Sequence, residues 1–251
     1  MTVRVEDVTY IAAGREILSG LSLEVPEGML VSVMGMSGSG KSTLLKCIAG
    51  LIKPASGHIY LGDIDIVPLP ERRLAPLRRN IGMVFQYAAL FDSMTVYDNV
   101  AFGVRRHFPS ITKPQLDEIV SQNLRRVGLD GIGNLMPSQL SGGMQKRVGI
   151  ARALATNPRV LLYDEPTSGL DPITARVIDD LALGLKNDLG VTTVVVSHNL
   201  ASVFRISDKV AMLSDGRIVE CGPPEQIRNS SNPAVRQFVE GTPHGPLKVV
   251  G

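Results

Sequence analysis

The sequence predicts an α/β fold with a mostly parallel sheet, an antiparallel β subdomain and an inserted, all-helical subdomain. Three observations predict it. Short apolar strands alternate with helical segments on both sides of the chain's middle, a glycine-rich loop separates one such strand from a helix, and the middle itself shows no convincing strand. Alternating strands and helices are typical of parallel sheets with helices on both faces.

The first part of the chain carries two strand patterns. Apolar and polar residues alternate over 3–8 and again over 21–25, which predicts antiparallel strands with one face in water. Residues 29–34 are mostly apolar, which is typical of a strand buried on both faces. Further elements expected before residue 87 are a helix over 41–50 that ends at a glycine, and strands at 59–61 and 81–85.

The middle of the chain predicts helices alone, and strands return after it. The expected helices are 96–102, 114–127 and 142–155. Later elements are strands at 160–163, 191–196, 210–213 and 217–220, an amphipathic helix through 178–189 and a small helix at 234–239. The predicted domains are therefore an α/β core with its β subdomain (1–86 and 157–222), a helical subdomain (87–156), and a C-terminal helix and tail (223–251).

Composition narrows the function classes. The net charge is +2, so bulk electrostatics gives no case for nucleic acid as a partner. The two cysteines, Cys47 and Cys221, have no metal-ligand spacing and fit a reducing, cytoplasmic compartment. The first residues lack the apolar stretch of a signal peptide, and no apolar run approaches the ~20 residues of a membrane-spanning helix. We expect any membrane crossing to come from another chain.

The glycine-rich loop Gly35-Met-Ser-Gly-Ser-Gly-Lys-Ser-Thr43 predicts a phosphate-binding site. Glycines let the backbone N–H groups reach phosphate oxygens, and the following helix points its positive end at the anion. Lys41 supplies a charge for the β and γ phosphates, and the Ser42 hydroxyl suits Mg²⁺. The expected nucleotide-binding residues here are Gly35, Ser37, Gly38, Ser39, Gly40, Lys41, Ser42 and Thr43.

Two acidic residues follow the apolar strand at 160–163. Asp164 stands at the carboxyl end of that strand, where parallel sheets meet their ligands, and its carboxylate suits a magnesium shell. Glu165, one residue further, is placed to polarise water for in-line attack on the γ-phosphate. Alone, the pair could simply open the next loop at Pro166, but a phosphate loop in the same sheet favours catalysis.

The segment Leu140-Ser-Gly-Gly-Met-Gln145 precedes a predicted helix. Ser141 suits the N-cap, and Gly142 and Gly143 expose backbone N–H groups, which makes a second anion site. Through this segment the chain resembles the ATP-binding cassette (ABC) family, whose signature sequence the segment matches. The resemblance covers nearly the whole chain and implies a P-loop NTPase (RecA-like) core that binds ATP and Mg²⁺.

The resemblance also implies roles for residues whose own signal is weak. Gln86 matches the Q-loop glutamine, which contacts magnesium and the attacking water, and Asp171 lies in the matching D-loop. His198 matches the switch histidine at the γ-phosphate, and Tyr10 resembles the aromatic that stacks on adenine. The implied catalytic residues are Glu165, His198 and Gln86; the implied metal ligands are Ser42, Gln86 and Asp164; and Tyr10, Ser141, Gly142, Gly143, Gln145 and Asp171 complete the nucleotide contacts.

The chain contains one phosphate loop and one signature segment, and in the family the signature of one subunit closes over ATP held by the other. The resemblance therefore implies a homodimer with two shared sites. It further implies a peripheral protein on the cytoplasmic face of the cell membrane, with a permease docked near Gln86–Phe91. An apolar patch there could equally belong to the core of the helical subdomain.

Several runs are similar to the Mla/Mce-associated lipid transporter ATPases: 88–100, 135–143, 171–173 and 232–241. This subclass implies a phospholipid cargo, and its members can engage a small STAS-type regulatory protein and an Mce-type lipid-binding protein. Two alternatives stay open. One is the ATPase of a polar amino-acid importer, and the other is a soluble ATPase of iron–sulfur assembly, which has a similar size.

Overall fold

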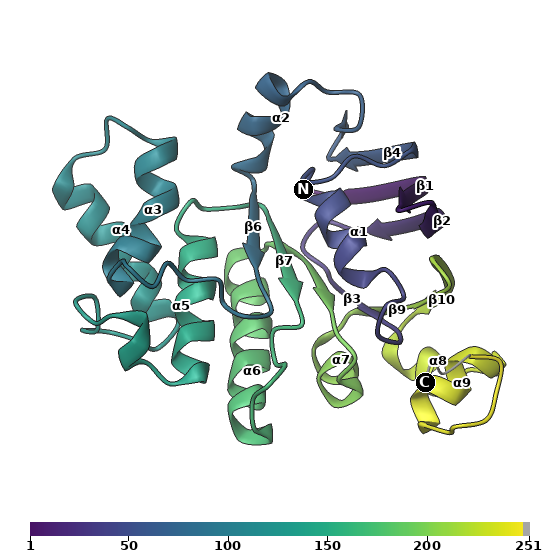
Figure 1. The fold of residues 1–251 in the computed structure, drawn as a ribbon. Helices are drawn as coiled ribbons and strands as arrows, with labels where there is room; N and C mark the ends of the chain where they lie inside the picture. The colour runs from purple at the N-terminus through teal and green to yellow at the C-terminus, as the bar shows by residue number, and fades with distance from the viewer. Residues whose placement is uncertain (248–251) are drawn as a thin grey trace.

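The computed structural model describes residues 1–247, so the last residues of the predicted tail, 248–251, lie outside the described part. The strands form two sheets (Figure 1). One is four-stranded in the order β2-β1-β4-β5, and the other is six-stranded in the order β10-β9-β3-β8-β7-β6. The predicted α/β class is confirmed.

The six-stranded sheet holds the buried core strands. Its members are β3 (Leu30–Met34), β6 (Ile81–Val84), β7 (Val160–Asp164), β8 (Thr192–Val196), β9 (Lys209–Ser214) and β10 (Arg217–Gly222). All neighbours pair in parallel except β9 and β10. Every residue of β3, β7 and β8 is buried, which explains their continuous apolar runs.

The four-stranded sheet comprises β1 (Val3–Ala12), β2 (Arg15–Val25), β4 (Ser56–Leu61) and β5 (Ile64–Asp65). Its pairings are antiparallel, with Val3 opposite both Val25 and Leu61. Buried and exposed residues alternate in β2, as the sequence pattern predicts for a sheet with one wet face.

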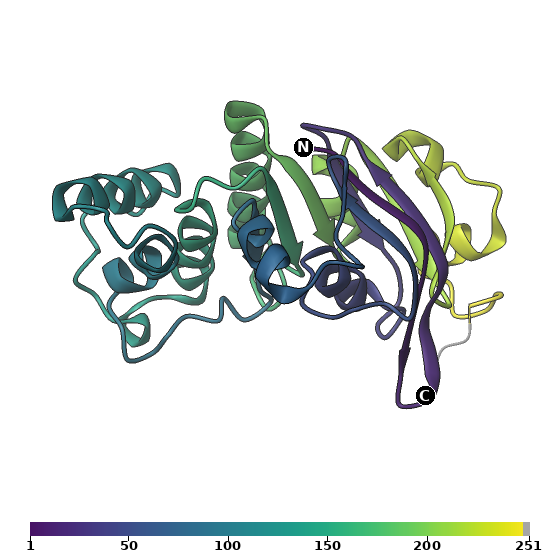
Figure 2. The same ribbon diagram turned by 90° about the horizontal axis from the view of Figure 1, so that it is seen from above.

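Helix α1 (Lys41–Ile48) lies between the two sheets (Figure 2). Its Leu44, Leu45 and Ile48 are fully buried in a cluster with side chains of both sheets. A fully buried Leu or Ile contributes about 1.5–3 kcal/mol to stability, so this packing fixes the helix firmly. The opposite face of the parallel sheet packs against α6 (Pro172–Leu189). The start of α1, which follows the glycine-rich loop, is thus fixed by the packing of the helix between the two sheets.

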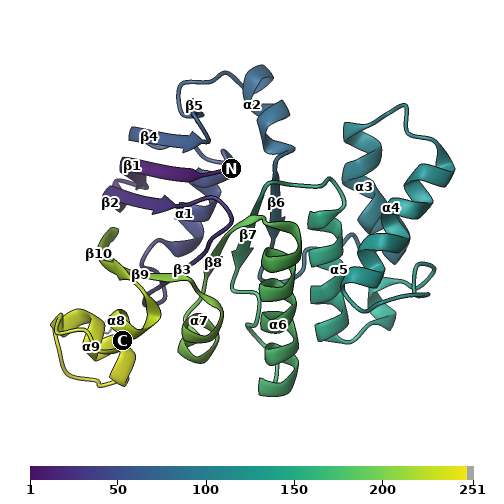
Figure 3. The same ribbon diagram turned by 180° about the vertical axis from the view of Figure 1, so that it is seen from behind.

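The middle of the chain forms a helical lobe beside the parallel sheet (Figure 3). It contains α3 (Val96–His107), α4 (Lys113–Arg126), a 3-10 turn η1 (Pro137–Gln139) and α5 (Gly142–Leu154). Between residues 87 and 156 the described structure holds no strand, as predicted. Helix α5 packs on both α3 and β6, so it joins the lobe to the core.

The remaining elements are short. They are α2 (Glu71–Arg78), α7 (Leu200–Ile206), α8 (Pro224–Arg228) and α9 (Pro233–Glu240). Beyond α9 the chain folds back, and the side-chain amide of Gln237 accepts from the Leu247 N–H at 2.7 Å and donates to its carbonyl at 3.3 Å. Among residues 1–247, no helix combines the length and apolar character needed to cross a bilayer.

Candidate nucleotide-binding site

The glycine-rich loop runs from β3 into α1, and two of its glycines are required by close contacts. A Cβ atom on Gly35 would lie 2.2 Å from the carbonyl oxygen of Leu213. Gly40 caps α1 in a left-handed conformation (φ 104°), and a Cβ there would lie 2.9 Å from the Ile17 carbonyl oxygen. Since any other residue would clash, the neighbouring strands force the loop into a tight backbone wrap.

Lys41 is buried at the centre of this loop. Its Nζ donates to the carbonyls of Gly35 and Met36, both at 2.8 Å. Burial lowers the pKa of the Lys41 amine, and the nearby charges of Glu165 and Asp164 oppose that shift. The ammonium group is therefore held inside the loop, where it lines the cavity and could contact a phosphate oxygen.

Ser42 and Asp164 bring two oxygens together beside the loop. The Ser42 hydroxyl donates to Asp164 Oδ1 at 2.8 Å, although the residues are 122 positions apart in sequence. Mg²⁺ in nucleotide sites is typically bound through one or two carboxylates together with phosphate oxygens and water, so this hard-oxygen pair fits the ion. Among residues 1–247 no group of three or more His, Cys, Asp or Glu side chains forms an all-protein metal site.

Glu165 and His198 form a second pair at the same edge of the sheet. His198 Nδ1 lies 2.9 Å from Glu165 Oε2, and the His198 backbone N–H also donates to that oxygen at 3.4 Å. Glu165 is 8% exposed and adopts a left-handed backbone conformation (φ 48°), which is uncommon outside glycine. The carboxylate is thus oriented by its backbone and by the imidazole.

Gln86 follows β6 and is engaged at both its backbone and its side chain. Its Nε2 donates to the Ser168 hydroxyl at 3.3 Å, and its carbonyl accepts from Lys146 Nζ. Burial lowers the pKa of Lys146, and the charges of Glu165 and Asp164 oppose that shift. Gln86 thus connects the segment after Glu165 with the signature helix.

These residues surround one cavity of about 1030 Å³. Ten of the residues expected from the sequence line it: Tyr10, Ser37, Gly38, Gly40, Lys41, Ser42, Thr43, Gln86, Glu165 and His198. Ser39 does not line it, and its buried hydroxyl has no hydrogen-bond partner among the described residues. Gly35 and Asp164 stand behind the cavity, where they shape the loop and hold Ser42.

The signature residues form a separate surface. Ser141 caps α5 by accepting the Met144 N–H at 3.3 Å, and Ser141 and Gly142 are both exposed. Gln145 donates its amide to the Pro137 carbonyl at 3.0 Å, and Asp171 caps α6 by accepting two backbone N–H groups. Within the described chain, none of these residues lines the cavity. The structure therefore does not bring them to the phosphate loop of the same chain.

Comparison with known proteins identifies the family. The model of the ABC transporter family matches residues 18–168, which include the phosphate loop, the signature segment and both acidic residues. The chain belongs to the ABC transporter family. As an ABC cassette it is an ATPase that binds ATP.

Two curated relatives and one solved structure show where this ABC protein stands. It is 42% identical over 245 residues to the intermembrane phospholipid transport system ATP-binding protein MlaF of Escherichia coli, covering 98% of this chain and 91% of MlaF. It is 46% identical over 219 residues to the methionine import ATP-binding protein MetN of Corynebacterium jeikeium, covering 87% and 58%. A dimeric ATP-binding cassette in a post-hydrolysis state with ADP and Pi superposes with a TM-score of 0.81 and 34% identity, covering 88% and 98%.

Some residues at the site of this ABC protein escape the sequence reasoning. Met36, Leu200 and Phe238 form an apolar part of the cavity wall, and Phe238 comes from the C-terminal helix α9. Lys146 lies behind Gln86 and is 6% exposed. One signal in the sequence could have indicated Lys146. Most other residues of its helix are apolar or small, which predicts a buried helix, and a buried lysine needs a hydrogen-bond partner.

Proposed function

We propose that this ABC protein is the ATPase subunit of a phospholipid transporter and works as a homodimer on the cytoplasmic face of the membrane. The observation that carries the cargo is the MlaF match, which spans almost the full length of both chains. The alternative is the ATPase of a methionine importer, because the identity to that relative is higher over the aligned residues. It is less favoured, because the chain covers only 58% of that relative.

ATP is proposed to bind with its phosphates in the loop 35–43. Gly35, Ser37, Gly38, Ser39 and Gly40 wrap the β and γ phosphates, and Lys41, Ser42 and Thr43 complete the contacts. Mg²⁺ would be held by Ser42, Asp164 and Gln86, and when bound it neutralises phosphate charge. The 2.8 Å contact between the Ser42 hydroxyl and the Asp164 carboxylate supports this assignment.

Hydrolysis is proposed to use Glu165 as the general base. The carboxylate accepts a proton from water as that water attacks the γ-phosphorus in line, and the bond to the β–γ bridging oxygen breaks to leave ADP. His198 orients the carboxylate through its 2.9 Å contact and faces the γ-phosphate. Gln86 positions the attacking water once its amide leaves Ser168.

The signature segment is proposed to act on the ATP of a second copy. Ser141 and Gly142 are exposed at the N-terminus of α5, where backbone N–H groups favour an anion. In Figure 1, α5 lies on one side of β6 and β7 and α1 on the other, so the signature segment is separated from the phosphate loop of its own chain. Two copies related by a twofold axis complete both sites, and Gln145 and Asp171 hold the signature and D-loop backbones at that interface.

The permease is proposed to dock near Gln86–Phe91. Tyr87 is 84% exposed and Phe91 is 40% exposed, and the Phe91 ring lies 4.7 Å from that of Phe102, which is also exposed. Exposed aromatic clusters of this kind mark protein contacts. The other subunits of such a transporter would include an Mce-type lipid-binding protein.

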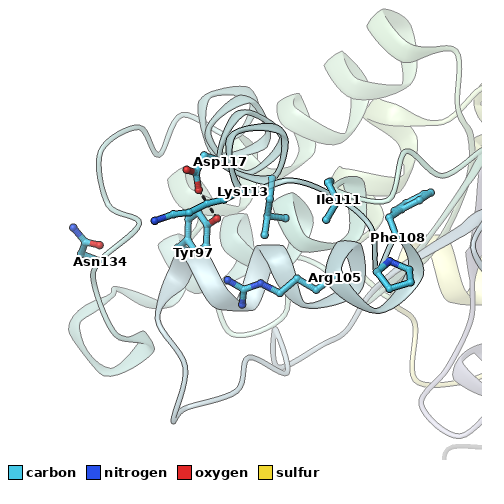
Figure 4. A pocket seen from close by; sticks show the side chains of 9 residues that line it. Tyr97, Arg105, Phe108, Ile111, Lys113, Asp117 and Asn134 are labelled. Carbon is cyan, nitrogen blue, oxygen red and sulfur yellow. Dashed lines mark hydrogen bonds between the residues drawn. The ribbon is translucent and has the colours of Figure 1, made fainter.

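A small STAS-type regulatory protein is proposed to bind the helical lobe. A cavity of about 610 Å³ opens between α3 and α4 and, among residues 1–247, shares no lining residue with the cavity beside the phosphate loop (Figure 4). Tyr97 donates to Asp117 at its rim at 2.5 Å, and Arg105 lies over the Tyr97 ring. Its mix of an aromatic ring and paired charges suits a protein surface better than a lipid tail.

Glu165→Gln tests the dimer mechanism. The amide cannot accept the proton of water but keeps the shape of the side chain, so ATP should bind without being hydrolysed and hold two copies together. Analytical ultracentrifugation of this variant with ATP and Mg²⁺ should show a dimer that is absent with ADP. A monomer under both conditions contradicts the mechanism.

Reconstitution with the permease tests the cargo. In vesicles, phospholipid presented to the complex should raise ATP turnover, and methionine should leave it unchanged. The reverse result would replace the proposed cargo with an amino acid. As a control, the Glu165→Gln complex should respond to neither compound, since any rise there would come from a contaminating ATPase.

A further inference from the structure

The signature helix α5 contacts the loop 86–89 through three of its residues, which are spaced three apart in the helix. Lys146 Nζ donates to the Gln86 carbonyl, and Arg152 donates to the carbonyls of Ala88 and Ala89 at 2.8 and 2.6 Å. Between these two cations, a Cβ atom on Gly149 would lie 3.4 Å from the Ala88 carbonyl oxygen, so helix and loop are in backbone contact. The loop and α5 are therefore held together at three places, and the contact of Lys146 is the one at Gln86.

Lys146 differs from Arg152 in where it points. It is 6% exposed and binds the one residue of the loop that also lines the ATP cavity. A buried ammonium group is costly, and its partner here is a carbonyl rather than a carboxylate.

The N-terminus of α5 is exposed at Ser141 and Gly142. Ser141 and Gly142 precede Lys146 by about one helical turn, which is roughly 6–8 Å along the axis. In the dimer mechanism of the preceding section, these two residues contact ATP held by the partner, whereas Gln86 lies beside the chain's own ATP. Lys146 stands between the two nucleotides.

We propose that Lys146 couples the two ATP sites of the dimer, by tying the helix that meets the partner's nucleotide to the Gln86 backbone at the chain's own nucleotide. The inference rests on the proposed homodimer. When the partner's ATP draws in the N-terminus of α5, Lys146 carries Gln86 with it and away from Ser168. Lys146 is thus a positioning residue, and it makes occupation of one site favour assembly of the other.

The first experiment measures ATPase rate against ATP concentration for the full chain, with Lys146→Met, Lys146→Arg and a control, Arg147→Met. The Hill coefficient should fall from roughly 2 toward 1 in Lys146→Met, because two sites no longer communicate. Lys146→Arg keeps a donor and should restore most of the cooperativity. Arg147 is the neighbouring cation but donates to the lobe carbonyls of Val127 and Gly128, so its variant should stay cooperative.

The second experiment reads the position of the loop without turnover. The chain has no tryptophan, so Tyr87→Trp places a single fluorophore beside Gln86. In a Glu165→Gln background, ATP-driven dimerisation should change its emission, and adding Lys146→Met should remove that change while the dimer, followed by ultracentrifugation, remains.

The outcomes separate the two proposals. A dimer that forms while Lys146→Met leaves both the Hill coefficient and the tryptophan response unchanged overturns the coupling role alone. A lower rate with unchanged cooperativity does the same, since it would show a structural role. If Glu165→Gln forms no dimer with ATP, the dimer mechanism falls and the coupling with it. A Hill coefficient near 1 in the unmodified protein overturns the coupling alone.

Discussion

Each reacting group of this ATP site is held by a partner that is distant in sequence. Ser42 is bonded to Asp164, and the Glu165 carboxylate is oriented by His198. Under the proposed mechanism, such preorganisation means that charge developing on the γ-phosphate would meet groups already in place. Tyr10, the residue proposed to stack on adenine, is half-buried and lines the same cavity.

Tyr10 offers a test at the residue scale. Tyr10→Ala should weaken ATP binding by about 1–3 kcal/mol if the ring stacks on the base, which is roughly a 5- to 150-fold rise in Kd. Equilibrium binding of a fluorescent ATP analogue measures it. Tyr10→Phe keeps the stacking surface and should bind like the unmodified chain. If Tyr10→Ala binds normally, the ring belongs to the β-subdomain core instead.

At the scale of the elements, helices with a broad buried face and capping residues were predictable. The amphipathic helix through 178–189 is α6, and Asp171 caps its start by binding the N–H groups of Ile173 and Thr174. Helix α2 was not predictable, because it buries only Leu74 and contains Pro76. Nothing in the local pattern distinguishes such a segment from a loop.

The candidate site also contains some residues that were predictable from the sequence and some that were not. The phosphate loop and the acidic pair were predictable because their spacing is dictated by backbone chemistry. Lys146, Arg152 and Phe238 were not, since their roles depend on which segment the tertiary fold places beside them. The roles of all these site residues in nucleotide contact remain predictions. In one copy the Gln145 amide donates to the Pro137 carbonyl, and Asp171 accepts the first N–H groups of α6.

Asn99 offers a test at the element scale. This fully buried side chain accepts the Phe91 N–H at 2.8 Å and donates to the carbonyls of Phe91, Met94 and Thr95. Asn99→Ala should cost about 1–3 kcal/mol, since it leaves buried backbone groups unpaired. Calorimetry should show a lower Tm, by roughly 2–4 °C per kcal/mol in a chain of this size.

Asn123 supplies the matched control for that experiment. It is also buried on a lobe helix, but its amide donates to a single carbonyl, that of Ile119 in the same helix. Asn123→Ala should therefore lower Tm less than Asn99→Ala. Equal shifts would mean that the loop after Gln86 gains nothing from the Asn99 contacts.

At the scale of the whole molecule, the phosphate loop and the signature segment lie apart in one copy, and none of the signature residues lines the cavity. The cavity with the phosphate loop lies between the core and β subdomain, and the signature lies on the helical lobe. A single copy cannot join them. The lobe meets the core through α5 and the loop 86–89, so its placement sets the position of the signature relative to the cavity.

Mixing two inactive variants tests this arrangement. Lys41→Ala removes the phosphate loop's cation and Ser141→Arg blocks the signature, so each should be inactive alone. A mixed dimer retains one intact loop facing one intact signature, which restores roughly a quarter of the sites after random exchange. ATPase assays on an equimolar mixture should detect it. If activity does not return although mixed dimers form, each signature serves its own chain.

The left-handed backbone at Glu165 has a consequence for evolution and engineering. A non-glycine residue in that conformation gives up about 1–3 kcal/mol of folding free energy. Substitutions selected only for heat resistance would therefore drift toward glycine or asparagine at this position and discard the carboxylate. At this one position, higher thermostability and ATP turnover favour different residues. A screen for thermostable variants therefore needs to measure ATPase activity as well.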